Sequence, residues 1–336
     1  MVELIKSLCE LDAVSGDEFA VRDFIISQID GFCEWKTDAL GNIIAFKKGE
    51  KRPAQKVMVD AHMDEVGLII TSITSDGFLK FKTVGGIETP ALMFRKVKIN
   101  GNINGVISGK PIHLISASEA KKMPEKESLY IDIGAKDREE AEKTVKIGDM
   151  ATFDVEFNTA EEKIISKALD DRIGCALLIM LLRKTSKYDF YATFSVQEEL
   201  GCRGAKTATF SVAPQSAIVL EGTTAADIAE VIESKTVCKL GDGPVVSAMD
   251  LGTVYDKAYY NAALSSGIIC QPKKAVTGGN NSSAIHLSNE GVRTLAISAP
   301  CRYIHSSSSV ANINDCENAL NLCEYMLNGI CSGEIK

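Results

Sequence analysis

Apolar and polar positions change their spacing along the chain, and the changes divide it into parts. Residues 19–29 place apolar side chains roughly on one face of a helix, and Ser15 and Glu18 match the capping box that opens a helix. Residues 41–49 form a strand-like run that ends in a Lys/Gly turn. Residues 56–62 are almost continuously apolar, which is typical of a buried strand in a parallel sheet. The chain therefore begins as an α/β structure.

The spacing alternates after about residue 67, where short apolar–polar runs are separated by Gly, Asn and Asp turns. This texture predicts a small β-barrel or sandwich. From about residue 162 a helix that starts near Asp171 and apolar strands at 190–196, 215–220 and 292–298 restore the α/β pattern. We expect one α/β domain interrupted by an insertion. Its divisions are 1–66 for the first part, 67–161 for the β-barrel, and 162–336 for the second part.

Polar side chains that can bind metal follow several of the predicted strands. Ligands of open α/β sheets bind at the carboxyl ends of the strands, so in a parallel sheet these side chains would converge on one crevice. The candidates are His62 with Asp64, Glu198 with Glu199, Glu221 and His305, together with Asp170 and Asp171 ahead of a buried helix.

Imidazoles combined with carboxylates suit zinc, cobalt or manganese rather than copper or iron–sulfur centres. One shared carboxylate could bridge two ions, and a further carboxylate could take a proton from an attacking water. This would give Glu198 and Glu199 one role each. Simpler interpretations stay open, because an adjacent acidic pair is often a helix start or a solvated surface. His62 and His305 could also be structural, and His113 and His286 look like core or loop histidines.

Charge and composition exclude several classes of protein. The 336 residues carry a formal net charge of −8 and no basic stripe, which argues against a nucleic-acid partner. The longest apolar run, residues 173–182, is too short to cross a membrane. The first residues do not resemble a secretory signal, so we expect a cytoplasmic protein whose ten cysteines are reduced. The H-E-x-x-H, G-x-S-x-G and P-loop motifs are absent.

Four stretches, in order along the chain, resemble the dinuclear metallo-aminopeptidases of the glutamyl aminopeptidase and tetrahedral aminopeptidase type. They read AHMDEVG, KALDDRIG, SVQEELGCRGA and RYIHS. Further similarity, such as DALGNIIAFKKG near the start and AIHLSNEGVRTLAIS near the end, extends the resemblance over nearly the whole chain. Some members of this family carry an endoglucanase label.

The resemblance implies a zinc-exopeptidase-like fold, in which helices sandwich a mixed, largely parallel sheet and the small β-barrel is an inserted dimerisation domain. It implies two divalent ions per subunit, zinc or cobalt with manganese as an alternative, and short peptides cleaved from the N-terminus. It also implies a homo-oligomer built from dimers, up to a tetrahedral dodecamer. The implied metal ligands are His62, Asp170 as the bridge, Glu199, Glu221 and His305. Glu198 would be the general base, Asp64 would orient His62, and Asp171 would follow Asp170 across a cis peptide.

Two positions depart from the family pattern. Glu221 stands where the family has Asp, and in related dinuclear hydrolases a Glu there accompanies carboxypeptidase or deacylase activity. Asn281 replaces an Asp and removes a charge that we expect near the substrate. The alternatives are therefore a metal-dependent deacylase or carboxypeptidase, a glycoside hydrolase, or a non-catalytic homologue. The glycosidase fits poorly, because its two carboxylates flank the scissile bond and Glu198 and Glu199 are sequence neighbours.

Overall fold

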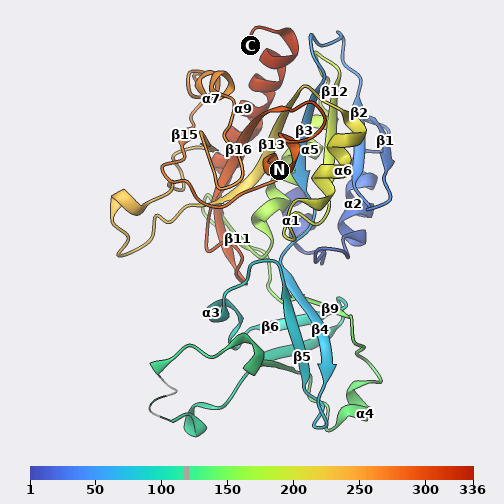
Figure 1. The fold of residues 1–336 in the computed structure, drawn as a ribbon, viewed down its shortest axis with the longest axis vertical. Helices are drawn as coiled ribbons and strands as arrows, with labels where there is room; N and C mark the ends of the chain where they lie inside the picture. Colours follow the sequence, from blue (N-terminus) through green and yellow to red (C-terminus); the bar gives the residue numbers. More distant parts are fainter. Residues whose placement is uncertain (117, 119–120) are drawn as a thin grey trace.

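The computed structural model describes residues 1–116, 118 and 121–336 and shows a molecule with two lobes. The larger lobe is an α/β structure that contains both termini, and the smaller lobe is a β-barrel joined to it by a narrow waist (Figure 1). The expected fold class, a mixed and largely parallel sheet between helices with an inserted barrel, is confirmed.

The sheet of the larger lobe runs in the order β1-β2-β12-β3-β13-β16-β17-β11-β10, and β14 and β15 extend it beside β16. Its central strands β12, β3, β13 and β16 are parallel, and the strands at both edges are antiparallel. The bounds are β1 (Glu34–Thr37), β2 (Ile43–Lys47), β3 (Val57–His62), β10 (Asn158–Ala160), β11 (Lys163–Ser166), β12 (Phe190–Ser195), β13 (Ser216–Thr224), β14 (Val245–Val246), β15 (Gln271–Pro272), β16 (Arg293–Arg302) and β17 (Ser309–Asn312).

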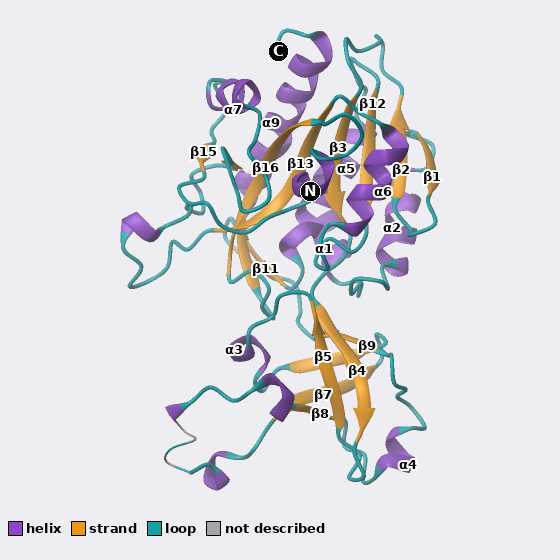
Figure 2. Cartoon of the chain, viewed as in Figure 1, coloured by secondary structure: helices purple, strands orange, loops and turns teal. Residues whose placement is uncertain are grey.

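Helices cover both faces of this sheet (Figure 2). Along β13, Ile218 and Leu220 enter one core with the apolar faces of α1, α2, α5, α7 and α9, whereas Ala217 and Val219 enter a second core with α6 and α8. This alternation follows from the two-residue period of a strand. The bounds are α1 (Val2–Cys9), α2 (Phe19–Ile29), α5 (Leu169–Arg183), α6 (Arg203–Val212), α7 (Lys257–Leu264), α8 (Ser282–Ile285) and α9 (Ile313–Ser332), with the 3-10 helix η4 (Glu233–Lys235).

The smaller lobe is a closed antiparallel barrel in the order β4-β5-β8-β7-β6-β9, with an apolar core of its own. Its strands are β4 (Gly67–Ile73), β5 (Leu79–Val84), β6 (Lys96–Ile99), β7 (Ile103–Ser108), β8 (Tyr130–Asp132) and β9 (Met150–Phe153). The short helices of this lobe are α3 (Thr89–Leu92), α4 (Arg138–Ala141), η1 (Ile112–Leu114) and η3 (Lys126–Ser128).

The capping box predicted for α2 is wrong, because long-range partners occupy both of its side chains. The Ser15 hydroxyl donates to Asp64 at 2.6 Å, and the Glu18 carboxylate accepts from the backbone N–H groups of Gly16 and Gln197. Helix α2 begins at Phe19 without a side-chain cap. The two residues instead fasten the chain ahead of α2 to the ends of β3 and β12.

Strand β13 extends further than predicted. It continues beyond Glu221 to Thr224, because its last residues pair with Ala299–Cys301 of β16. On its other side, β3 pairs with β13 only from Ser216 to Val219. Glu221 therefore lies inside a strand rather than at its end, at the point where the neighbouring strand has stopped.

Candidate functional site

The predicted donor residues converge at the carboxyl ends of the parallel strands. His62 ends β3 and is 1 % exposed. Its Nε2 atom lies 3.2 Å from Oε1 of Glu221 on β13 and 3.4 Å from Oδ1 of Asp170 at the start of α5. Three elements that are distant in sequence thus place an imidazole and two carboxylates together.

A second group lies on the other side of Asp170. His305, in the loop after β16, places Nε2 3.5 Å from Oδ2 of Asp170 and 3.1 Å from Oε1 of Glu199. The two oxygens of Asp170 therefore face two different histidines. This is the arrangement expected of a carboxylate that bridges two ions.

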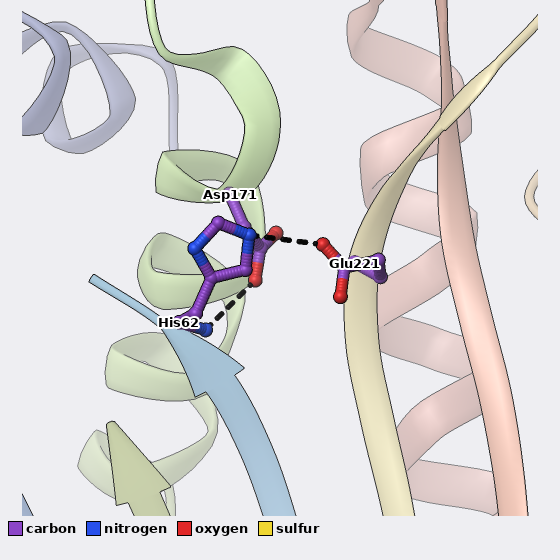
Figure 3. Close-up of side chains that lie close together, drawn as sticks. All are labelled: His62, Asp171 and Glu221. Atoms are coloured by element: carbon purple, nitrogen blue, oxygen red, sulfur yellow. Dashed lines mark hydrogen bonds and ion pairs between the residues drawn. The ribbon is translucent and has the colours of Figure 1, made fainter. Parts of the chain in front are cut away.

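Asp171 also lies close to His62, as Figure 3 shows, but its oxygens are occupied. Oδ2 accepts a hydrogen bond from the backbone N–H of His62 at 3.2 Å, and Oδ1 accepts one from the N–H of Gly174 at 2.9 Å. The peptide bond between Asp170 and Asp171 is cis. Asp171 thus ties the start of α5 to the end of β3 and leaves Asp170 facing the two histidines.

Asp64 is buried beneath the site and holds several of its parts. Oδ1 lies 3.3 Å from Nδ1 of His62, and the carboxylate accepts hydrogen bonds from the backbone N–H groups of Glu198 and Glu199 at 2.9 and 3.1 Å. With the Ser15 hydroxyl it has four neighbours of donor type. One carboxylate therefore holds the backbone of the acidic pair by hydrogen bonds and lies beside the His62 ring, whose Nδ1 has no hydrogen-bond partner among the described residues.

Glu198 and Glu199 point to different neighbours. Glu199 contacts His305, whereas Oε1 of Glu198 contacts the thiol of Cys202 at 3.3 Å. Burial raises the pKa of Glu198 to about 7. Sequence reasoning missed the Cys202 contact, which arises because α6 begins at Arg203, directly after the turn that follows the acidic pair.

The site has an excess of buried negative charge. Burial raises the pKa of Glu221 well above its usual range, and its Oε2 atom is buried with no hydrogen-bond partner among the described residues. Burial by itself would lower the pKa of His305, but its contacts with Asp170 and Glu199 raise it to about 11. A centre that binds protons this strongly attracts cations.

These features fit a metal centre. Ligand atoms of His62, Asp171 and Glu221 lie within 4.8 Å of one another, and so do those of His62, Asp170 and Glu199. Imidazole nitrogen and carboxylate oxygen are ligands that zinc and related divalent ions accept. The unpartnered oxygen of Glu221 would gain a partner in a bound ion.

The barrel lobe also reaches the site, which the sequence did not predict. The ring atom Nδ1 of His305 lies 3.1 Å from the backbone oxygen of Gly86, which follows β5. A carbonyl at this position fixes the ring so that Nε2 faces Asp170 and Glu199. His113 and His286 lie outside the cluster: His113 is exposed in η1, and His286 contacts the carbonyl of Ser282.

Asn281 lies deeper than expected. It is buried, and its amide donates to Oδ2 of Asp60 and to the hydroxyl of Ser195, both at 2.7 Å. The expectation that it removes a charge next to the substrate is not supported by this position. Compared with Asp, it removes a charge from a buried network between β3 and β12. Its neighbour Asn280, by contrast, lines a pocket together with Glu198 and His305.

Known proteins are similar to this chain in fold and in sequence. The family described as M42 glutamyl aminopeptidase matches residues 41–322. The chain belongs to this family. The lysyl aminopeptidase of Pyrococcus furiosus is 34% identical, and the match covers 97% of this chain and 96% of that protein. As a member of this metal-dependent family, the chain is a peptidase of the aminopeptidase type, which confirms the expected class of enzyme.

Solved structures agree over nearly the whole chain. The aminopeptidase APDkam598 of Desulfurococcus kamchatkensis superposes with a TM-score of 0.91 at 35% identity, covering 96% of this chain and 93% of that one. The TET1 peptidase of Pyrococcus horikoshii, described as assembling into a tetrahedron or a large octahedral shell, gives 0.85 at 33%, covering 97% and 98%. A structure labelled endoglucanase, from Thermotoga maritima, gives 0.82 at 35%, covering 99% of each chain.

Proposed function

We propose that the protein is a two-metal aminopeptidase that removes N-terminal residues from short peptides. One observation carries the proposal: the two oxygens of Asp170 face His62 and His305, and the neighbouring Glu198 is left free of both histidines. The free carboxylate next to two groups of ligands is the arrangement needed for a hydrolase that activates water.

We assign His62 and Glu221 to one ion and Glu199 and His305 to the other, with Asp170 shared. When bound, the ions supply a Lewis acid for the scissile carbonyl and make water a better nucleophile at neutral pH. Zinc, cobalt and manganese all accept this set of ligands.

Glu198 acts as the general base in this proposal. It takes a proton from the attacking water and returns it to the amine that leaves. Its carboxylate lies next to both groups of ligands and contacts neither histidine, which leaves it free for both steps. Asp64 acts through other residues, since it orients the His62 ring and holds the backbone of Glu198 and Glu199.

The experiment compares Glu198→Gln with His62→Ala after both proteins are reloaded with metal. Glu198→Gln should keep the wild-type metal content and lose hydrolysis of amino-acid p-nitroanilides by at least ~10²-fold, the usual contribution of a general base. His62→Ala should lose metal, measured by elemental analysis. The assignment fails if Glu198→Gln loses metal and Glu199→Gln keeps it, or if the reloaded wild type holds fewer than one ion per chain.

Because a Glu at position 221 accompanies deacylase or carboxypeptidase activity in related hydrolases, these activities are the second candidate function. Free-amine peptides and their N-acetylated forms separate the two. An aminopeptidase cleaves only the former, so faster cleavage of N-acetylated peptides would favour the second class. Activity on cellulose that survives chelation would favour the glycosidase, but the carboxylates here are clustered with histidines rather than placed on two sides of a groove.

We also infer a homo-oligomeric, cytoplasmic protein. The TET1 peptidase structure supports the first inference through its described shells, and the barrel would supply the dimer contact. The ten free cysteines, most of them buried, suit a reducing compartment. Within the described part of the chain, no helix has the length and apolar character needed to span a bilayer.

A further inference from the structure

A small pocket opens directly over the candidate metal centre. Its volume is about 120 Å³. Glu198, Asp170 and His305 form part of its wall, and Lys273 with residues 277–280 forms another part. The pocket can therefore hold one residue-sized group beside the reacting bond.

Lys273 brings a positive charge into this acidic pocket. Among the described residues that line the pocket, it is the one Lys or Arg. Its backbone N–H donates to the carbonyl of Val246, which fixes the chain just after β15. Its side chain is half-buried, and Nζ donates to the carbonyl of Thr277 at 2.7 Å.

The ammonium group of Lys273 has spare capacity for an anion. An ammonium has three donors, and Nζ uses one of them in its hydrogen bond to the neutral carbonyl of Thr277. Across residues 1–116, 118 and 121–336, Lys273 forms no ion pair within 4 Å. The carboxylate of the nearby Asp250 instead accepts hydrogen bonds from the N–H groups of Gly252 and Thr253 and from the Tyr255 hydroxyl. Partial burial lowers the pKa of Lys273, whereas the negative charges of Asp250 and Glu221 nearby act in the opposite direction.

We propose that Lys273 binds a carboxylate of the substrate and makes the enzyme selective for peptides that carry one close to the scissile bond. This inference rests on the proposed function, because it assigns a substrate class to the same site. The names of the family and of the Pyrococcus furiosus relative, glutamyl and lysyl, differ in the residue they indicate, so the preference must come from this chain's own pocket.

Two parts of a peptide could supply the carboxylate. One is an acidic side chain on the N-terminal residue, and the other is the C-terminal carboxylate of a dipeptide. Both would form a charge-assisted hydrogen bond to Nζ, which is stronger than a bond between neutral groups. Matched pairs of substrates separate the two sources. The p-nitroanilides of Glu and Gln differ only in the side-chain charge, and Leu-Gly and Leu-Gly amide differ only in the terminal charge.

The test compares wild type, Lys273→Met, Lys273→Arg and the control Lys274→Met, all metal-loaded. Lys274 is the exposed neighbour, so its removal controls for a general change of charge. We expect Lys273→Met to reduce the ratio of kcat/KM within one pair, Glu over Gln or Leu-Gly over its amide, by at least ~10-fold. Lys273→Arg should retain much of that ratio, and Lys274→Met should leave it unchanged.

The pair that responds identifies the source of the carboxylate. If Lys273→Met hydrolyses the neutral substrates normally and neither ratio changes, the inference is overturned while the proposed function stands. An equal fall for charged and neutral substrates would also overturn it, because it would indicate damage to the site. If the metal-loaded wild type cleaves no free-amine substrate, the proposed function fails and the inference fails with it.

Discussion

Asn281 lies in a buried network that joins the strands carrying the candidate ligands. Its amide donates to Asp60, which also accepts hydrogen bonds from the hydroxyls of Thr193 and Ser195. Asp60 lies two residues before His62 on β3, and Ser195 ends β12 just ahead of the acidic pair. An amide at position 281 can donate to the buried carboxylate, whereas a carboxylate there would face it as a like charge.

Asn281→Asp should therefore destabilise the protein. It removes two hydrogen bonds and places a second acid against Asp60, and we expect a loss of about 2–4 kcal/mol in the free energy of unfolding. Urea denaturation of the metal-loaded protein measures this. The double variant Asp60→Asn/Asn281→Asp should regain part of the lost free energy of unfolding, because it again pairs one acid with one amide. Equal stability of Asn281→Asp and wild type would contradict this account.

Strand β13 approaches the start of α5 closely, and this contact determines where the candidate bridging residue lies. The N–H of Gly222 donates to Oδ1 of Asp170 at 3.3 Å. A Cβ atom at Gly222 would lie 2.9 Å from the same oxygen and 3.0 Å from the Asp170 side-chain carbons. Since Asp170 faces both histidines, a displacement here would affect both groups of ligands.

Gly222→Ala should lower metal content and hydrolysis without unfolding the protein. We expect at least ~10-fold lower kcat/KM, the usual effect of disturbing groups that position metal ligands. Ser298→Ala, at the residue that pairs with Glu221 in β16, is the control on the neighbouring strand. Elemental analysis and circular dichroism of the two variants check the prediction. Full metal content and activity in Gly222→Ala would show that Asp170 tolerates the added methyl group.

The strand ends were predictable, and the contacts between distant loops were not. His62, Glu199, Glu221 and His305 follow apolar runs, and parallel strands present their carboxyl ends at one edge of a sheet. The sequence contains that pattern. It does not show that β13 continues to Thr224, because this depends on pairing with a strand about 80 residues away. The capping box failed for the same reason, since Ser15 and Glu18 found partners outside their own helix.

The two lobes of the molecule meet next to the site. Gly86, in the barrel lobe, contacts the ring of His305, and Thr152 of β9 donates to Asp12 at 2.7 Å. Behind these contacts, Glu65 accepts from the buried cations Lys167 and Arg172. The division of the chain at residues 66 and 161 stays a prediction; the strands of the barrel begin at Gly67 and end at Phe153.

Glu65→Gln should destabilise the whole protein strongly. It leaves Lys167 and Arg172, which are 4 % and 0 % exposed, without their shared carboxylate. Removal of one partner of a buried ion pair typically costs about 3–5 kcal/mol. Lys184→Met, which breaks the exposed ion pair with Glu324, is the control and should change stability by less than ~1 kcal/mol. Urea unfolding measures both, and a similar effect of the two variants would contradict the prediction.

The central claim is that the residues around Asp170 hold two metal ions. Anomalous diffraction from crystals of the zinc-loaded protein, collected above and below the zinc absorption edge, tests it most directly. We predict two anomalous peaks on the two sides of Asp170, one next to His62 and Glu221 and the other next to Glu199 and His305. A zinc-loaded crystal with no peak at this site, or with peaks only elsewhere in the molecule, would contradict the account.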